Sequence, residues 1–259
     1  MTFESTAAGV SARTYRATVQ YDGTAYFGFQ RQRRGVRSIQ AELEQALSRL
    51  ANCPIRVLGA GRTDTGVHAL GQVIAFTMEW PERHGTAALH RALNANLPPD
   101  IVVADMVEVA PGFHPRFDAR CRGYEYHILL APVRRPLWHR RALHVAGPLD
   151  VAQMNAAAAL LVGVNDFATF GRPTTGDSTV REVYGAIWRR EGEFLIFDIR
   201  ANAFLNRMVR SIVGSLKMVG SGQWTLDDFS TAFAVRKRSR SAMAAPAHGL
   251  YLMSVEYDN

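Results

Sequence analysis

The sequence has two cysteines among its 259 residues, Cys53 and Cys121, and they lie far apart. Neither forms part of a CxxC pair, so the chain lacks the spacing of a disulfide framework and of a thiolate zinc site. This pattern fits a reducing compartment, and we expect a cytoplasmic protein.

Long apolar runs are also lacking. The longest one, residues 156–164, is far shorter than the roughly 20 residues that an apolar helix needs to cross a bilayer. The first dozen residues lack the basic start and apolar core of a secretory signal. We therefore expect no membrane partner, and a flexible N-terminal tail over residues 1–13.

Lysine is scarce, and arginine carries almost all of the positive charge. Lysine plus arginine number 30 against 23 acidic residues, which gives a net charge of +7 and an isoelectric point near 9.8. The guanidinium group of arginine binds phosphate with two hydrogen bonds and stacks on bases, so the excess of arginine over acidic residues indicates a nucleic acid partner. An arginine bias inherited from a GC-rich genome is the alternative, because alanine and glycine are also plentiful.

Length and patterning predict an α+β protein with two lobes, residues 14–115 and 116–259. A chain of this length lies near the point where one hydrophobic core divides. Tight turns alternating with helices favour mixed, mainly antiparallel sheets with helices on one face. Periodicity predicts strands over residues 15–21, 55–58, 73–76, 101–109, 124–130, 182–190, 194–200 and 249–257. It predicts helices over residues 39–50, where Ser38 provides the cap, and over 86–95, 150–161, 204–219 and 226–235.

A polar, glycine-rich loop, Gly59 to Gly66, lies between two predicted strands. Its glycines allow close approach of a ligand, and Asp64 emerges beside a permanent cation, Arg62. Arg62 could hold Asp64 ionised, or grip a phosphate while Asp64 attacks nearby. One alternative is a turn in which the aspartate caps its own backbone. Another is a divalent metal held by Asp64 and His68, although the glycines argue against the helix that this pair requires; we expect His68 to pack or hydrogen-bond beside the loop.

Further basic residues are candidates for contact with a polyanionic backbone. The predicted helix over 204–219 carries a basic side opposite an apolar side. The basic side is either solvated or bound to the partner. Three basic segments, over residues 31–37, 134–141 and 236–240, add further candidates, and the second is interleaved with aromatic residues, which suits irregular RNA. The candidates are Arg207, Arg210 and Lys217 on the helix, Arg31 and Arg33 in the first segment, and Arg134, Arg135 and Arg140 in the second.

At these residues the sequence resembles the tRNA pseudouridine synthase A family. The family's active-site signature, GRTDxGVHA, appears as Gly61 to Ala69, directly after a predicted strand. Its other landmarks appear in the family's order: Tyr21 to Gly23, Gly28 to Gln32, Asn94 to Pro98, Phe113 to Phe117, Asn165 to Phe167, Asn202 to Leu205, Met208 to Gly214 and Gly249 to Leu252. The resemblance extends over most of the chain.

The resemblance implies a two-lobed pseudouridine synthase fold with the active-site cleft between the lobes. It implies a homodimer that converts uridine to pseudouridine at positions 38, 39 and 40 in the anticodon stem-loop of tRNA. The conversion is an isomerisation without net oxidation, so we expect neither cofactor nor metal. By resemblance, Asp64 is the catalytic nucleophile, Arg62 is its ion-pair partner and positions the RNA, Arg210 lies near the cleft, and Tyr124 stacks on the target uracil. The alternation of Tyr124 with Tyr126 leaves open that it packs on the core.

The sequence departs from the family's pattern at four positions near these motifs. It has Thr65 where alanine is common and Phe29 where tryptophan is common. Gly123 and Glu125 flank Tyr124 at positions where the family has basic residues. No departure removes a catalytic group, but two of them lower the basic charge expected beside Tyr124.

Overall fold

All ten strands in the described part of the chain join into one sheet. The computed structural model describes residues 12–33 and 35–258, so the tail predicted over residues 1–13 lies outside the described residues except for its last two, which begin β1. The strand order is β4-β1-β3-β10-β5-β9-β8-β7, with β2 beside β3 and β6 beside β5. The strands are β1 (Ala12–Tyr21), β2 (Leu58–Gly59), β3 (His68–Glu79), β4 (Ile101–Val109), β5 (Ala119–Leu130), β6 (Leu143–Val145), β7 (Gly163–Asp166), β8 (Val180–Glu191), β9 (Phe194–Ala201) and β10 (Leu250–Tyr257).

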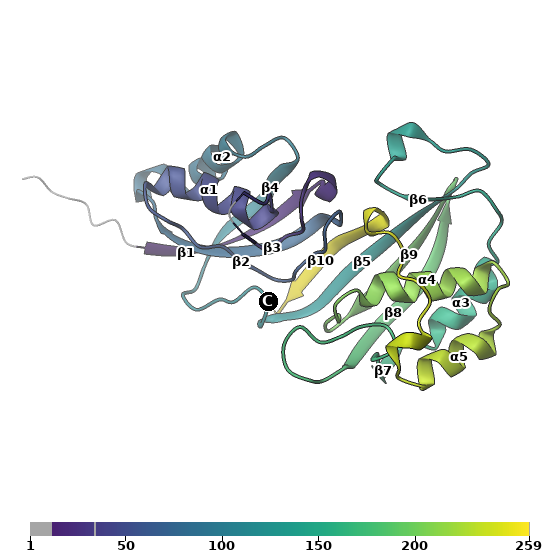
Figure 1. The fold of residues 1–259 in the computed structure, drawn as a ribbon. Coiled ribbons are helices and arrows are strands. Elements are labelled where there is room, and N and C mark those ends of the chain that lie inside the picture. Colours follow the sequence, from purple (N-terminus) through teal and green to yellow (C-terminus); the bar gives the residue numbers. More distant parts are fainter. Residues whose placement is uncertain (1–11, 34, 259) are drawn as a thin grey trace, which may run out of the picture.

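Five α-helices in the described residues form two groups over the sheet (Figure 1). The first group is α1 (Ile39–Ala51) and α2 (Gly85–Asn96), and the second is α3 (Val151–Ala159), α4 (Met208–Gly220) and α5 (Leu226–Ala234). Both groups lie on the same face, because Tyr124 of β5 packs against the hydrophobic clusters under both. The strand pairs are antiparallel except for β3 with β10 and β5 with β6. The predicted α+β class is therefore confirmed.

Alternating burial along β1 explains how α1 docks. Every second residue from Tyr15 to Tyr21 is buried, in one cluster with Ile39 and Leu43 of α1. Ser38 is the N-cap residue, as predicted, but its side chain makes no capping hydrogen bond. The apolar side of the helix, and not a capping side chain, therefore fixes α1 on the sheet.

The last strand, β10, lies in the middle of the sheet between β3 and β5 (Figure 1). Leu250 belongs to the cluster under α3, α4 and α5, whereas Leu252 belongs to the cluster under α1 and α2. Gly71 of β3 approaches β10 so closely that an added Cβ would lie 2.1 Å from the Met253 carbonyl oxygen. β10 thus contributes to both clusters, and the division into lobes over residues 14–115 and 116–259 stays a prediction.

Several elements differ from the predicted boundaries. β5 begins five residues before the predicted strand, and β6 and β7 were not predicted. The strand predicted over residues 55–58 is reduced to β2, Leu58–Gly59. β3 runs over His68–Glu79 and is much longer than predicted, because β1 and β10 flank it and bury it without clear alternation. The helix predicted over 204–219 begins only at Met208, because the preceding residues, 202–206, run beside other loops and Asn206 pairs with Arg172. Among the described residues, no helix is long and apolar enough to cross a membrane.

Candidate active site

Neighbouring segments hold the glycine-rich loop between β2 and β3 in place. Thr63 is buried, its hydroxyl lies 2.8 Å from that of Tyr21, and its carbonyl accepts a hydrogen bond from the Phe29 backbone at 3.0 Å. Gly28 has a φ of +88°, and an added Cβ there would lie 2.6 Å from the Thr63 carbonyl oxygen. Only glycine allows this approach, and the contacts fix the backbone next to Asp64.

Asp64 forms an ion pair with Arg210 of α4, a residue 146 positions further along the chain. Arg210 Nη1 donates to Asp64 Oδ2 at 2.8 Å, and Nε donates to the Ala245 carbonyl at 2.8 Å. The Asp64 side chain is 30% exposed and that of Arg210 is 16% exposed, so the pair is partly shielded from water. Such charge-assisted hydrogen bonds fix the direction of the carboxylate.

The prediction that Arg62 is the ion-pair partner of Asp64 was wrong. The Arg62 side chain is exposed, and no ion pair with Asp64 is found in residues 12–33 and 35–258. The loop directs the two neighbouring side chains differently, and the tertiary fold brings Arg210 to the carboxylate instead. The alternative of an aspartate that caps its own turn is not observed either, since the hydrogen bond found for this carboxylate comes from Arg210.

His68 lies beside the loop as a buried packing residue, as expected. Gly23 donates its backbone N–H to His68 Nδ1 at 3.1 Å, and His68 Nε2 lies 3.0 Å from the Arg140 carbonyl oxygen. The ring also stacks on Tyr251 with centroids 4.7 Å apart. Nδ1 also lies 3.2 Å from a carboxylate oxygen of Asp22. Both ring nitrogens thus have partners other than Asp64, and His68 does not form a ligand pair with Asp64.

Tyr124 lies where the two hydrophobic clusters meet, and it also lines the cavity that contains Asp64. Its ring meets Phe204 edge-on, with centroids 5.0 Å apart and planes at 82°. Burial raises the pKa of Tyr124, and the nearby Tyr21 hydroxyl and Asp64 carboxylate raise it further. The Tyr124 hydroxyl therefore stays protonated. Tyr124 therefore packs on the core and also offers an aromatic surface to a ligand.

A cavity of about 820 Å³ brings residues of both lobes together. Its volume lies within the usual range of ligand sites, which is about 300 to 1,000 Å³. Several of the predicted site residues line it, namely Arg62, Asp64, Tyr124, Arg207 and Arg210. Other predicted candidates are not among the lining residues, namely Arg31, Arg33, Arg134, Arg135, Arg140 and Lys217.

Two of the candidates outside the cavity are paired with acids. Arg31 lies 2.9 Å from a Glu44 carboxylate oxygen, and Arg135 lies 2.6 Å from a Glu193 carboxylate oxygen. A phosphate would have to displace these carboxylates. Both residues are therefore weaker candidates for RNA contact than their place in an arginine-rich segment suggests.

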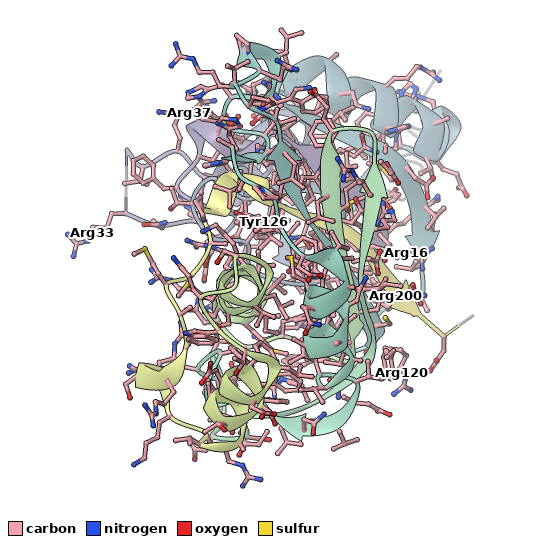
Figure 2. All side chains as sticks on the ribbon, turned by 90° about the vertical axis from the view of Figure 1, so that its right-hand side faces the viewer. Arg16, Arg33, Arg37, Arg120, Tyr126 and Arg200 are labelled. Carbon is pink, nitrogen blue, oxygen red and sulfur yellow. The ribbon has the colours of Figure 1, made fainter. Side chains whose placement is uncertain are left out.

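The remaining candidates outside the cavity differ in exposure. Arg33, Arg134 and Arg140 are exposed, and Figure 2 shows Arg33 extending away from the body of the molecule. Lys217 is partly buried near the end of α4, away from the cavity lining. The basic side predicted for this helix therefore reaches the cavity only at its start, through Arg207 and Arg210.

Three arginines that we did not single out from the sequence also line the cavity, Arg116, Arg122 and Arg181. Arg116 and Arg122 lie close together in sequence with Arg120, whereas Arg181 is isolated. Arg122 precedes Tyr124 by two residues on β5, so strand alternation places both side chains on one face. That periodicity is the signal that could have identified Arg122.

The departures beside Tyr124 do not remove charge from the cavity. Glu125 points to the opposite face of the sheet, where it pairs with Arg189 at 2.7 Å and with His127 at 2.8 Å. Gly123 faces that side too, because an added Cβ there would meet the Ser254 hydroxyl. The loss of basic charge predicted from Gly123 and Glu125 thus falls on the other face, and Arg122 supplies a cation on the Tyr124 face.

Comparison with known proteins identifies close relatives. A family model described as tRNA pseudouridine synthase matches residues 17–118 and 157–258. The chain is 43% identical over 240 residues to the tRNA pseudouridine synthase A of Aeromonas hydrophila, covering 92% of this chain and 88% of that protein. It is 43% identical over 253 residues to the protein of the same name from Chloroflexus aurantiacus, covering 95% and 89%. A relative of that name from Neisseria gonorrhoeae is 42% identical over 241 residues, covering 93% and 90%.

The buried histidines beside the loop predict a loss of stability in mild acid. Burial lowers the pKa of His68 and of His248 below 6.5, so the folded state binds protons at these rings less readily than the unfolded chain does. The unfolded chain binds these protons as the pH falls below about 6.5. The free energy of unfolding should therefore decrease as the pH falls below that value, and this contribution to stability should be fully present above it. Urea unfolding at pH 7.5 and 5.5 measures the decrease. His68→Gln should reduce it, whereas the same substitution at the exposed His84 should not. Equal pH dependence in both variants would contradict the assignment.

Proposed function

The chain belongs to the tRNA pseudouridine synthase family, and from this premise we propose that it isomerises uridine to pseudouridine in tRNA. We propose that it acts at positions 38, 39 and 40 of the anticodon stem-loop, with Asp64 as the catalytic nucleophile. One observation carries the proposal most directly. A carboxylate held by Arg210 lines the same cavity as the aromatic side chain of Tyr124.

The chemistry requires a nucleophile and a pocket that retains a detached base. The bond between uracil N1 and ribose C1′ breaks, the base turns, and C5 bonds to C1′ while C5 loses its hydrogen and N1 gains one. Asp64 supplies the carboxylate, and Arg210 fixes its direction before the substrate arrives. The reaction involves no net oxidation, so these side chains need no redox partner.

Access to the uridine requires that the base leave its stack. Flipping a nucleotide out of RNA costs a few kcal/mol, and stacking on an aromatic ring returns about 1–3 kcal/mol. In the proposed complex Tyr124 provides that ring inside the cavity. We propose that Arg62 contacts the RNA next to the flipped nucleotide, which its exposed position in the cavity lining supports.

Contacts to the RNA backbone extend the site beyond the cavity. Arg207 lies at its edge, and the exposed Arg33, Arg134 and Arg140 are the outer candidates. We further propose that the active form is a homodimer in the cytoplasm, as the family resemblance implies. Turnover, RNA binding and assembly can each be measured separately.

Removal of the Asp64 carboxylate should abolish turnover but not RNA binding. The substrate is an anticodon stem-loop RNA with tritium at C5 of a single uridine, placed at position 38, 39 or 40, and the buffer contains EDTA. Wild-type protein should release tritium from each RNA, and Asp64→Ala and Asp64→Asn should release none. Affinity should stay within about tenfold, because interactions with phosphate supply most of the binding. Release by Asp64→Asn, or from uridine outside these positions only, would contradict the proposal.

Arg134 and Arg135 form a matched pair for testing the outer candidates. Arg134→Gln should weaken tRNA binding and lower the slope of log affinity against log salt by about one unit, which corresponds to one phosphate that is no longer neutralised. Arg135→Gln removes the same charge from the next residue, but Glu193 already neutralises Arg135, so its slope should change less. Equal slopes for wild type and Arg134→Gln would place this segment off the RNA path.

Sedimentation equilibrium tests the proposed dimer. The chain mass is 28.7 kDa, and a homodimer would sediment with about twice that mass, in a concentration range where activity per chain is constant. A monomer mass with full activity would rule out a required dimer.

A further inference from the structure

The turn between β4 and β5 presents an exposed aromatic ring to the cavity. Phe117 is 70% exposed, yet it lines the same cavity as Asp64 and Tyr124. Single exposed apolar residues are common on protein surfaces and need no explanation. Phe117 differs because hydrogen bonds within the turn and from the sheet hold the backbone that carries it.

Residues 114–118 close on themselves through one aspartate and one histidine. Asp118 Oδ2 accepts the His114 backbone N–H at 2.9 Å, and the Asp118 N–H donates to the His114 carbonyl at 3.1 Å. His114 Nδ1 accepts the Arg116 backbone N–H at 3.2 Å. The turn is therefore rigid within itself, and its direction does not depend on the Phe117 side chain.

Two side chains of the sheet also hold this turn. The Tyr257 hydroxyl of β10 donates to the Pro115 carbonyl at 2.7 Å, and the Arg122 guanidinium of β5 donates to the Arg116 carbonyl. On the other side of the cavity, Arg116 donates to the Thr175 hydroxyl at 3.2 Å. Phe117 is thus presented from a backbone anchored to the strand that carries Tyr124.

The Phe117 ring has two aromatic or cationic neighbours and is still 70% exposed. The His114 ring lies against it with centroids 4.3 Å apart and planes at 34°, and the Arg116 guanidinium carbon lies 5.6 Å from the Phe117 centroid. Arg122 and Arg181 add positive charge to the same cavity. An open aromatic surface among fixed cations suits a nucleobase that belongs to a polyanionic strand.

We propose that Phe117 is a second stacking platform, which binds an unpaired base adjacent to the target uridine in the same RNA strand. This inference rests on the proposed function and adds to it a binding site for the neighbouring nucleotide. When the target base leaves the stack, the neighbouring base loses a stacking partner. Phe117 stacks on the face of the neighbouring base that is exposed in this way. Stacking is tolerant of base identity, so the platform selects an unpaired neighbour and not a particular base.

Phe117→Leu keeps an apolar side chain and removes the aromatic face. We expect kcat/KM on an anticodon stem-loop RNA to fall by roughly tenfold, within the range of about 5- to 150-fold that corresponds to the removal of one aromatic stacking partner. Phe117→Tyr should restore wild-type values. Tyr184→Ala removes an exposed aromatic residue that does not line the cavity and should leave kcat/KM unchanged.

A binding experiment separates this inference from the proposed activity. An RNA carrying 2-aminopurine next to the target uridine, on either side in turn, is bound to Asp64→Ala protein, which holds the substrate without converting it. With Phe117 present, the fluorescence on one side should remain quenched by stacking; with Phe117→Leu added, it should rise. Phe27 is another exposed aromatic residue in the lining of this cavity. Equal fluorescence and equal kcat/KM with phenylalanine and leucine at position 117 would overturn the inference, as would losses that Phe27→Leu causes and Phe117→Leu does not. Failure of wild type to release tritium would refute the activity, while the fluorescence would still report on stacking.

Discussion

The ion pair of Asp64 and Arg210 is the interaction on which the site depends. A partly buried carboxylate requires a compensating charge, and the loop that carries Asp64 provides none, because its own arginine points to solvent. The partner comes from α4, which packs on the other half of the sheet. The geometry of the site is therefore coupled to the docking of the second group of helices, and neither lobe alone would present the carboxylate in this way.

The central position of β10 makes this docking possible. The end of the chain returns between β3 and β5, and its alternate residues Leu250 and Leu252 pack into the two separate hydrophobic clusters. The Tyr126 hydroxyl donates to the Pro246 carbonyl just before the strand, which fixes the segment that also receives Arg210 at Ala245. A continuous sheet thus holds the loop of Asp64 and the start of α4 at a constant separation, as preorganised catalysis requires.

The distribution of arginine separates two tasks. Cavity arginines come from distant parts of the sequence, such as Arg62, Arg122 and Arg181, and the fold collects them around one space. The arginine-rich runs lie outside the cavity lining, where several of their members are already paired with acids. Charge composition thus indicates the class of partner correctly, whereas runs of arginine are a poor guide to which residues line the site.

The sequence by itself determined the fold class, most helices and strands, the family and the loop that carries Asp64. These follow from local periodicity and from a motif whose residues are contiguous, so each signal is complete within a short stretch of chain. The tertiary structure alone decided which cation pairs with Asp64, that Glu125 faces away from the cavity, and that Phe117 faces into it. The face of Glu125 follows from strand alternation once the face of Tyr124 is known. The other facts depend on residues far apart in sequence and on the central place of β10, and no local pattern contains that information.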